Sequence, residues 1–142
     1  MITLLISILL FIVFLFLSAI HFYWGLGGSW GSEASIPTNE KGEKVMNPKV
    51  VECFVVGLSL LSMGLLILAK SELLIFNLPD WLLKYGLWAI AFIFLLRALG
   101  EFQYIGIFKK VKHTRFGKMD TKFYSPLCLT IAILILILEL KK

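Results

Sequence analysis

The residues best suited to chemistry lie at the borders of long apolar runs. Arg97 lies about one helical turn inside the end of one run, and Glu101 follows four residues later, so a helix would place both charges on one face. Ionisable side chains inside membrane spans usually bind a ligand, transfer a proton or form ion pairs. The candidate ligand-binding residues are His21, Tyr23, Trp24, Glu52, Arg97, Glu101, Gln103, Asp120, Tyr124, Ser125 and Cys128.

These residue types allow three interpretations. They are a polar clasp between helices if Arg97 pairs with Glu101 or Asp120 and His21 bonds to a carbonyl or carboxylate. They line a pocket if Arg97 meets the anionic or carbonyl headgroup of a lipid-like or amphiphilic small molecule. They are the site of a membrane-embedded enzyme acting on a lipidic substrate if His21 or Glu101 is a general acid or base. We adopt the pocket, which is compatible with the clasp, and leave catalysis open.

Several other functions fit the pattern less well. We predict no metal and no cofactor, because the chain lacks paired ligand spacing and the glycines after residue 24 follow no strand. Cys53 and Cys128 have no CxxC spacing, and a disulfide between them would require Cα atoms within about 7 Å. The absence of an internal repeat argues against a transporter. An accessory or structural subunit of a membrane complex, or a homo-oligomer, remains an alternative.

Composition places the candidate residues in a membrane protein. The chain has 142 residues, of which 59% are hydrophobic and only 16% are charged, so a soluble domain of this size could not bury its apolar surface. A span needs about 20 apolar residues, because the rise is about 1.5 Å per residue and the hydrocarbon core is about 30 Å thick. We predict one all-α membrane domain over residues 1–142, with spans at about 2–20, 49–69, 81–99 and 121–140.

The expected fold is an antiparallel four-helix bundle. The first apolar run has no preceding Lys or Arg and no small-residue cleavage pattern, so we interpret it as an uncleaved span. Gly57 and Gly64 form a seam on the second span that lets another helix approach closely. Pro126 either starts the regular part of the fourth span or kinks it. The polar residues should converge at one end of the bundle, while the opposite half is nearly all Leu, Ile and Phe.

Charge predicts the orientation of the bundle. Nine of the 14 Lys and Arg residues lie in or beside loops 25–48 and 101–121, and four lie on the opposite side. The positive-inside rule therefore predicts cytoplasmic loops and both termini outside, in the cell membrane. Aromatic residues are interleaved with six basic residues over 101–123, and beside two spans this basic segment, 109–122, favours anionic lipid headgroups over nucleic acid. Membrane lipids are thus the expected partners, with another membrane protein possible.

Three motifs resemble a known family. They read H-x-Y-W-x-x-G-G-x-W-G at residues 21–31, R-A-x-G-E-F-x-Y-x-G at 97–106, and T-x-F-G-x-x-D-T-x-x-Y-S-P-L-C-L at 114–129. Together they are similar to the domain of unknown function 3995 family of small bacterial four-span membrane proteins. The resemblance covers the exits of the first and third spans and the start of the fourth. It implies the fold and the choice of residues, and it implies no reaction.

Overall fold

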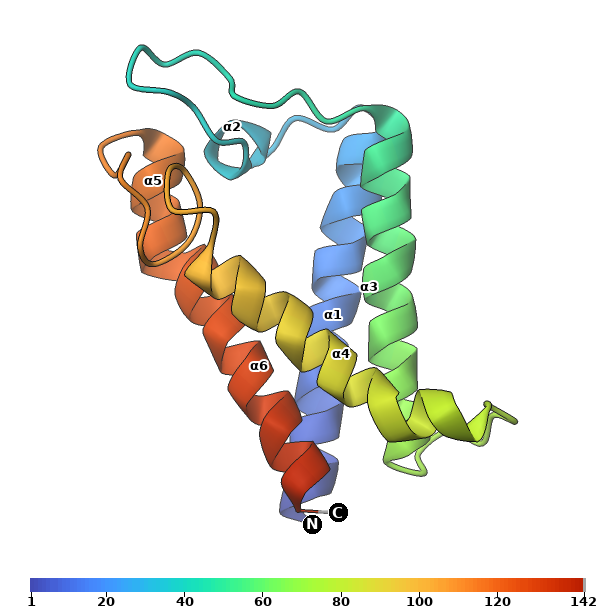
Figure 1. Ribbon diagram of the computed structural model, residues 1–142. Helices are drawn as coiled ribbons and strands as arrows, with labels where there is room; N and C mark the ends of the chain where they lie inside the picture. Colours follow the sequence, from blue (N-terminus) through green and yellow to red (C-terminus); the bar gives the residue numbers. More distant parts are fainter. Residues whose placement is uncertain (142) are drawn as a thin grey trace.

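The computed structural model describes residues 1–141 and confirms the all-helical fold. Four long apolar helices could each cross a membrane: α1 (Ile2–Gly25), α3 (Val50–Lys70), α4 (Asp80–Leu99) and the continuous helical segment Arg115–Leu140. The last comprises α5 (Arg115–Met119), the π-helix η1 (Asp120–Tyr124) and α6 (Ser125–Leu140). The four spans run antiparallel, with α2 (Ser32–Ser35) and the two longer loops at one end and the termini at the other (Figure 1).

The observed helix ends differ from the ends of the predicted spans where a glycine or a capping side chain sets them. The first helix runs to Gly25 rather than to residue 20, and it stops where Gly27 takes a φ of +96°. The fourth span begins at Arg115, capped by the Thr114 hydroxyl, which accepts a hydrogen bond from the Gly117 N–H at 2.9 Å. Loop 25–48 is not wholly irregular, because it contains α2 and an antiparallel bridge between Thr38 and Lys44.

Of the two possibilities for Pro126, starting the regular part of the fourth span or kinking it, the structure shows the first: Pro126 lies in the first turn of α6, directly after a π-helical turn. Proline lacks an N–H, and its ring collides with the carbonyl four residues earlier in a regular helix. The wider turn of η1 lies immediately before α6, which places Pro126 in the first turn of that helix. The span therefore continues through the proline as one helical segment from Arg115 to Leu140.

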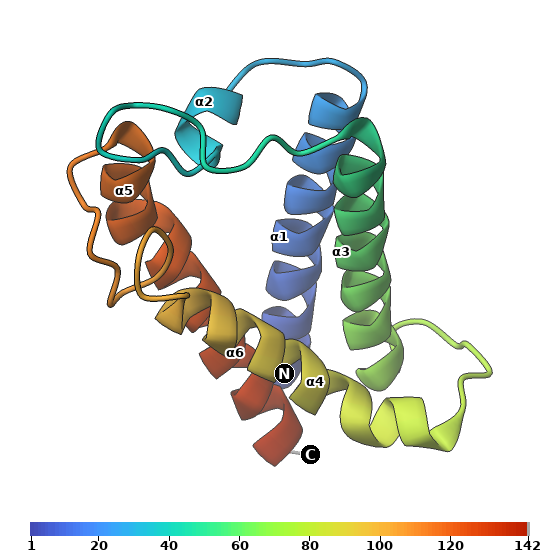
Figure 2. The same cartoon turned by 45° about the horizontal axis from the view of Figure 1, so that its top comes forward.

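The bundle consists of two helix pairs. In the pair α1 and α3, the predicted glycine seam is confirmed: Gly57 lies against the Phe22 ring and Gly64 against Phe14 and Phe11. The Ser18 hydroxyl donates to the Gly57 carbonyl at 2.7 Å and so joins the two helices where they approach closely. The pair α4 and α6 meets the first pair through a core that includes Phe14 and Phe94. Towards the loops the two pairs diverge (Figures 1 and 2).

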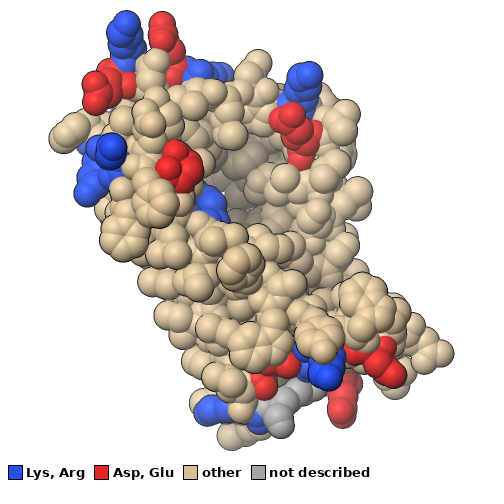
Figure 3. Space-filling model, in the orientation of Figure 1, with Lys and Arg blue, Asp and Glu red and all other residues tan. Residues whose placement is uncertain are grey.

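The end of the bundle that carries the termini is more polar than predicted. Lys70 and Glu139 form a mostly buried ion pair at 3.2 Å, and Ser7 hydrogen-bonds Ser71 at 2.5 Å. A cavity of about 150 Å³ lies beside Lys70 and Ser71. The prediction of an almost wholly Leu, Ile and Phe half is therefore wrong, because α3 and α6 run in the same direction and both end here, which brings Lys70 to Glu139. Charged side chains on the face in Figure 3 gather at both ends and leave an uncharged band between.

Candidate functional site

Asp120 is the centre of the polar site at the loop end. It is the first residue of η1, and its side chain is fully buried. One carboxylate oxygen accepts a hydrogen bond from Arg97 Nη2 at 2.9 Å. The other accepts from the Gly106 N–H at 2.8 Å and lies 3.0 Å from Lys109 Nζ. Two cations and one backbone donor therefore surround a single buried carboxylate, which compensates for its loss of hydration.

Lys109 is the residue that sequence reasoning missed. The basic segment 109–122 is expected to face anionic headgroups, yet the Lys109 side chain is fully buried. Its ammonium donates to the Gly106 carbonyl at 3.0 Å and to the Thr121 hydroxyl at 2.6 Å, in addition to pairing with Asp120. No pattern distinguishes Lys109 from its neighbours Lys110 and Lys112, because only the path of the loop decides which lysine points inward.

The loop after α4 takes this path because two glycines come together. Gly100 has φ +80° and ψ −172°, a region that essentially only glycine adopts, and Gly106 has φ +94°. A Cβ on Gly100 would collide with the Ile105 carbonyl, and one on Gly106 with the Leu99 carbonyl. The Ile107 N–H donates to the Ala98 carbonyl at 2.8 Å and closes the loop. The closed loop brings both Gly106 and Lys109 to Asp120.

Glu101 is not the partner of Arg97. The predicted pairing assumed that the helix continues to residue 101, whereas α4 ends at Leu99 and Gly100 turns the chain away. The Glu101 carboxylate instead accepts backbone hydrogen bonds from Gln103 at 3.2 Å and Ile105 at 3.1 Å, and from Tyr104. It therefore holds the loop in shape, and the predicted alternative, pairing of Arg97 with Asp120, is the one observed.

Arg97 retains capacity for a further partner. Its Nη2 bonds to Asp120, whereas Nη1 is buried and has no hydrogen-bond partner among the described residues. The side chain as a whole is 32% exposed. Ser125, on the first turn of α6, likewise has a buried hydroxyl without a partner among the described residues, and Cys128 is buried on the same helix. From the predicted set, the structure thus joins Arg97 and Asp120 directly, and it buries Ser125 and Cys128 on the helix that follows Asp120.

His21 and its neighbours have local partners. His21 Nδ1 bonds to the Leu17 carbonyl at 2.7 Å, and its ring lies edge-on to Trp24. Trp24 Nε1 donates to the Trp30 carbonyl at 2.8 Å, and the Tyr23 hydroxyl accepts from the Trp30 N–H at 3.4 Å. These contacts fasten the start of the first loop, and none of them joins His21 to Arg97 or Asp120.

The remaining predicted residues also stabilise local structure. Tyr124 donates to the Ala34 carbonyl at 3.1 Å and so holds α2 against η1. Glu52 is exposed and accepts from the Lys49 N–H at 2.9 Å in the cap of α3. Gln103 is exposed, and among the described residues its side-chain amide bonds only to the Tyr104 hydroxyl, at 3.4 Å. Within residues 1–141, no three His, Cys, Asp or Glu side chains are grouped to hold a metal ion, and both cysteines are free thiols.

Comparison with known proteins identifies the family. A family model described as a protein of unknown function, DUF3995, matches residues 14–135. The chain belongs to the DUF3995 family. The matched DUF3995 region contains every candidate site residue and also Lys109. No match was found among curated proteins or among solved structures. The DUF3995 assignment confirms the resemblance seen in the three motifs, and with the four apolar helices it makes the protein a four-span membrane protein.

Proposed function

We propose that the protein binds an amphiphile with an anionic headgroup at the loop end of the bundle. The observation that carries this proposal is the Arg97 side chain, which is 32% exposed and whose Nη1 has no hydrogen-bond partner among residues 1–141. A guanidinium offers its donors in a planar fork that suits phosphate and carboxylate groups, and one prong of this fork is already oriented by Asp120. A headgroup oxygen at Nη1 would complete the hydrogen bonding of Arg97.

The charge of the site favours an anion. Asp120 carries one negative charge, whereas Arg97 and Lys109 carry two positive charges. Lys109 is saturated by Asp120, the Gly106 carbonyl and the Thr121 hydroxyl, so the uncompensated charge belongs to Arg97. A net positive charge held at membrane depth is costly unless an anion neutralises it. A ligand with one negative charge would therefore be preferred over a neutral one.

The shape of the bundle supports an apolar tail on the same ligand. The helix pairs α1–α3 and α4–α6 diverge towards the loops, and the face in Figure 3 is hollowed between their loop-bearing halves. A cationic side chain is visible at the edge of this hollow (Figure 3). A lipid tail in the hollow would continue the apolar surface of the helices, while its headgroup reached Arg97.

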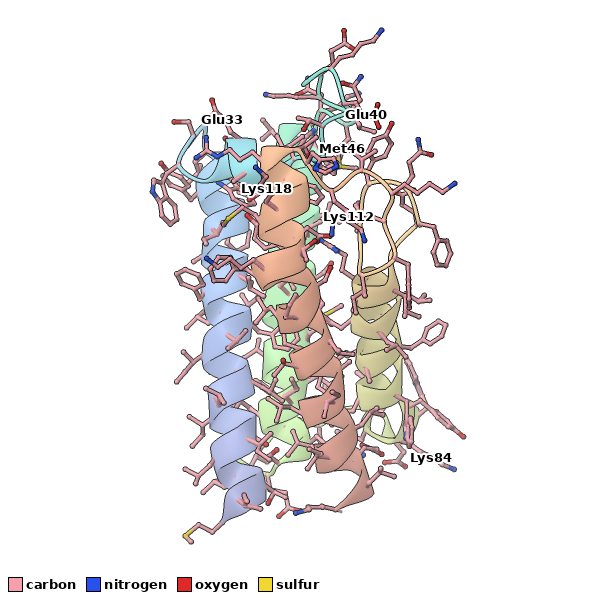
Figure 4. All side chains as sticks on the ribbon, turned by 90° about the vertical axis from the view of Figure 1, so that its left-hand side faces the viewer. Glu33, Glu40, Met46, Lys84, Lys112 and Lys118 are labelled. Atoms are coloured by element: carbon pink, nitrogen blue, oxygen red, sulfur yellow. The ribbon has the colours of Figure 1, made fainter. Side chains whose placement is uncertain are left out.

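Native mass spectrometry tests this binding. The protein purified in mild detergent from cells is expected to retain an anionic amphiphile, and Arg97→Gln to reduce its occupancy by about tenfold or more, because a hydrogen bond to a charged group contributes about 1.5–3 kcal/mol. Two controls keep Arg97 intact: Leu96→Ala changes a 51% exposed neighbour on the same helix turn, and Lys84→Gln removes a cation at the other end (Figure 4). Equal amphiphile retention in Arg97→Gln and in both controls would contradict the proposal.

We also propose that loops 25–48 and 101–121 face the cytoplasm and that both termini lie outside. Both loops lie at one end of the bundle and both chain ends at the other (Figure 1). The exposed lysines Lys110, Lys112, Lys118 and Lys122 would then meet anionic headgroups of the inner leaflet, with Lys109 withdrawn into its ion pair. Lys112 and Lys118 are labelled in Figure 4.

Labelling of single cysteines checks this orientation. In a Cys53→Ser and Cys128→Ser background, Lys141→Cys is expected to react with a membrane-impermeant maleimide in intact cells. Lys118→Cys is expected to react only after the cells are permeabilised, because the reagent cannot reach the cytoplasmic side. The opposite pattern would reverse the proposed orientation.

A further inference from the structure

A water-facing cleft lies between the two loops, apart from the Arg97 site. Its volume is about 790 Å³, within the range of about 300–1,000 Å³ that is usual for small-molecule sites. One wall comes from α2 and residues 38–44 of the first loop, and the other from residues 111–115 before and at the start of α5. None of the residues grouped around Asp120 lines it. The cleft is therefore separate from the Arg97 site and has its own chemistry.

Hydrogen bonds hold the walls of this cleft. The Asn39 N–H donates to the Glu43 carbonyl and the Val45 N–H to the Pro37 carbonyl, both at 2.9 Å. The side-chain oxygen of Asn39 accepts from the Lys41 and Glu43 N–H groups at 3.0 and 2.9 Å. These bonds form a compact hairpin in the first loop. Since Tyr124 also holds α2 against η1, the cleft exists before a ligand arrives, which lowers the entropic cost of binding.

The charges along the cleft are balanced and only partly used. Two acidic residues, Glu33 and Glu40, and two basic residues, Lys44 and Arg115, line it. Glu33 and Arg115 pair with each other across the loops at 3.3 Å. Within residues 1–141, no hydrogen bond engages the side-chain charge of Glu40 or of Lys44. Val111 is the one aliphatic side chain that lines the cleft, so its chemistry suits a polar group rather than a lipid tail.

We propose that this cleft binds a small zwitterion that carries an ammonium group and an anionic group. An ammonium would meet the free carboxylate of Glu40, and the anionic group would meet Lys44, with the hydroxyl of Thr38 and the ring of His113 as further hydrogen-bonding groups in the lining. A simple anion would be repelled by Glu40, and a simple cation by Lys44. The zwitterion is either a free water-soluble molecule or the headgroup of an ethanolamine-type phospholipid.

Titration with glycerophosphoethanolamine tests the zwitterion site in the full chain. The protein in phosphatidylcholine nanodiscs is expected to bind this probe more tightly than glycerophosphoglycerol, which lacks the ammonium. Glu40→Gln and Lys44→Gln are each expected to weaken binding about two- to fivefold, the range for one exposed charge contact. Lys84→Gln, at the opposite end of the bundle, is the matched control and should leave the affinity unchanged (Figure 4).

Repeating the titration in phosphatidylethanolamine nanodiscs identifies the source of the ligand. Weaker binding of the free probe there would mean that the lipid headgroup competes for the cleft, and unchanged binding would assign the cleft to a soluble molecule. Both results support a zwitterion site. Equal affinity for the two glycerophosphodiesters, or identical binding by Glu40→Gln, Lys44→Gln and the control, would overturn it.

Discussion

Asp120→Ala is expected to destabilise the protein by about 3–5 kcal/mol, because it leaves the fully buried Lys109 and the partly buried Arg97 without their counter-charge. Lys109 is fully buried, and Arg97 is only 32% exposed, so water cannot replace the lost carboxylate around both. The Gly106 N–H also loses its acceptor, which frees the loop that follows α4. A lower melting temperature in nanodiscs, measured by differential scanning fluorimetry, would show this loss.

Two further variants test whether the loss of stability comes from the burial of the ion pair or from the loss of any ion pair. Glu33→Gln breaks the pair with Arg115, whose side chains are 73% and 78% exposed, and is expected to cost no more than about 1 kcal/mol. Lys109→Met together with Asp120→Ala should cost less than the sum of the two single substitutions, because the double variant removes a buried charge along with its partner. If Asp120→Ala melts like Glu33→Gln, the buried triad does not hold the loop end together.

Gly100→Ala is expected to open the loop that delivers Lys109 to Asp120. The residue has φ +80° and ψ −172°, which costs an alanine about 1–3 kcal/mol, and the added Cβ would collide with the Ile105 carbonyl. Once the loop opens, Cys128 near the triad should become accessible. In a Cys53→Ser background, faster labelling of Cys128 by maleimide, together with a lower melting temperature, is the expected result.

Gly42→Ala is the matched control for Gly100→Ala. Gly42 has a similar φ of +82°, but a Cβ there would meet no atom within 4 Å. It therefore shares the positive φ without the collision and lies far from Cys128 in sequence. Equal Cys128 labelling in the two variants would mean that the contact between Gly100 and Gly106 is not what closes the site.

The predicted spans succeeded because they depend on the length of apolar runs alone. The observed helix ends differ from the predicted ones where a single residue sets them. Gly27 ends α1, and Thr114 caps the helix before the fourth apolar run. The failed pairing of Arg97 with Glu101 has a signal in the sequence, since a glycine after the last apolar turn commonly ends a helix. Gly100 is such a residue. Because the helix ends before Glu101, the four-residue spacing does not place Arg97 and Glu101 on one helix face.

The candidate site was harder to predict than the spans. The sequence indicates Arg97 and Asp120, which form the ion pair, because each is ionisable and lies at the edge of an apolar run. Lys109 was assigned to the lipid-facing surface, because a lysine in a basic loop looks the same whether it is buried or exposed. Tyr23, Trp24 and Tyr124 were grouped with the site, whereas their hydrogen bonds fasten the first loop.

Sequence alone therefore determined the membrane class, the number of spans and the end of the bundle at which the polar groups of the site meet. These properties follow from the length of each apolar run and from the order of the runs along the chain, and both can be read from the sequence without knowing any contact between helices. Tertiary structure alone decided which charges pair, because Asp120 selects among several nearby cations through the path of one glycine-dependent loop. It also decided that Lys70 meets Glu139 across the other end, since ion pairing depends on distances of a few ångströms between helices far apart in sequence.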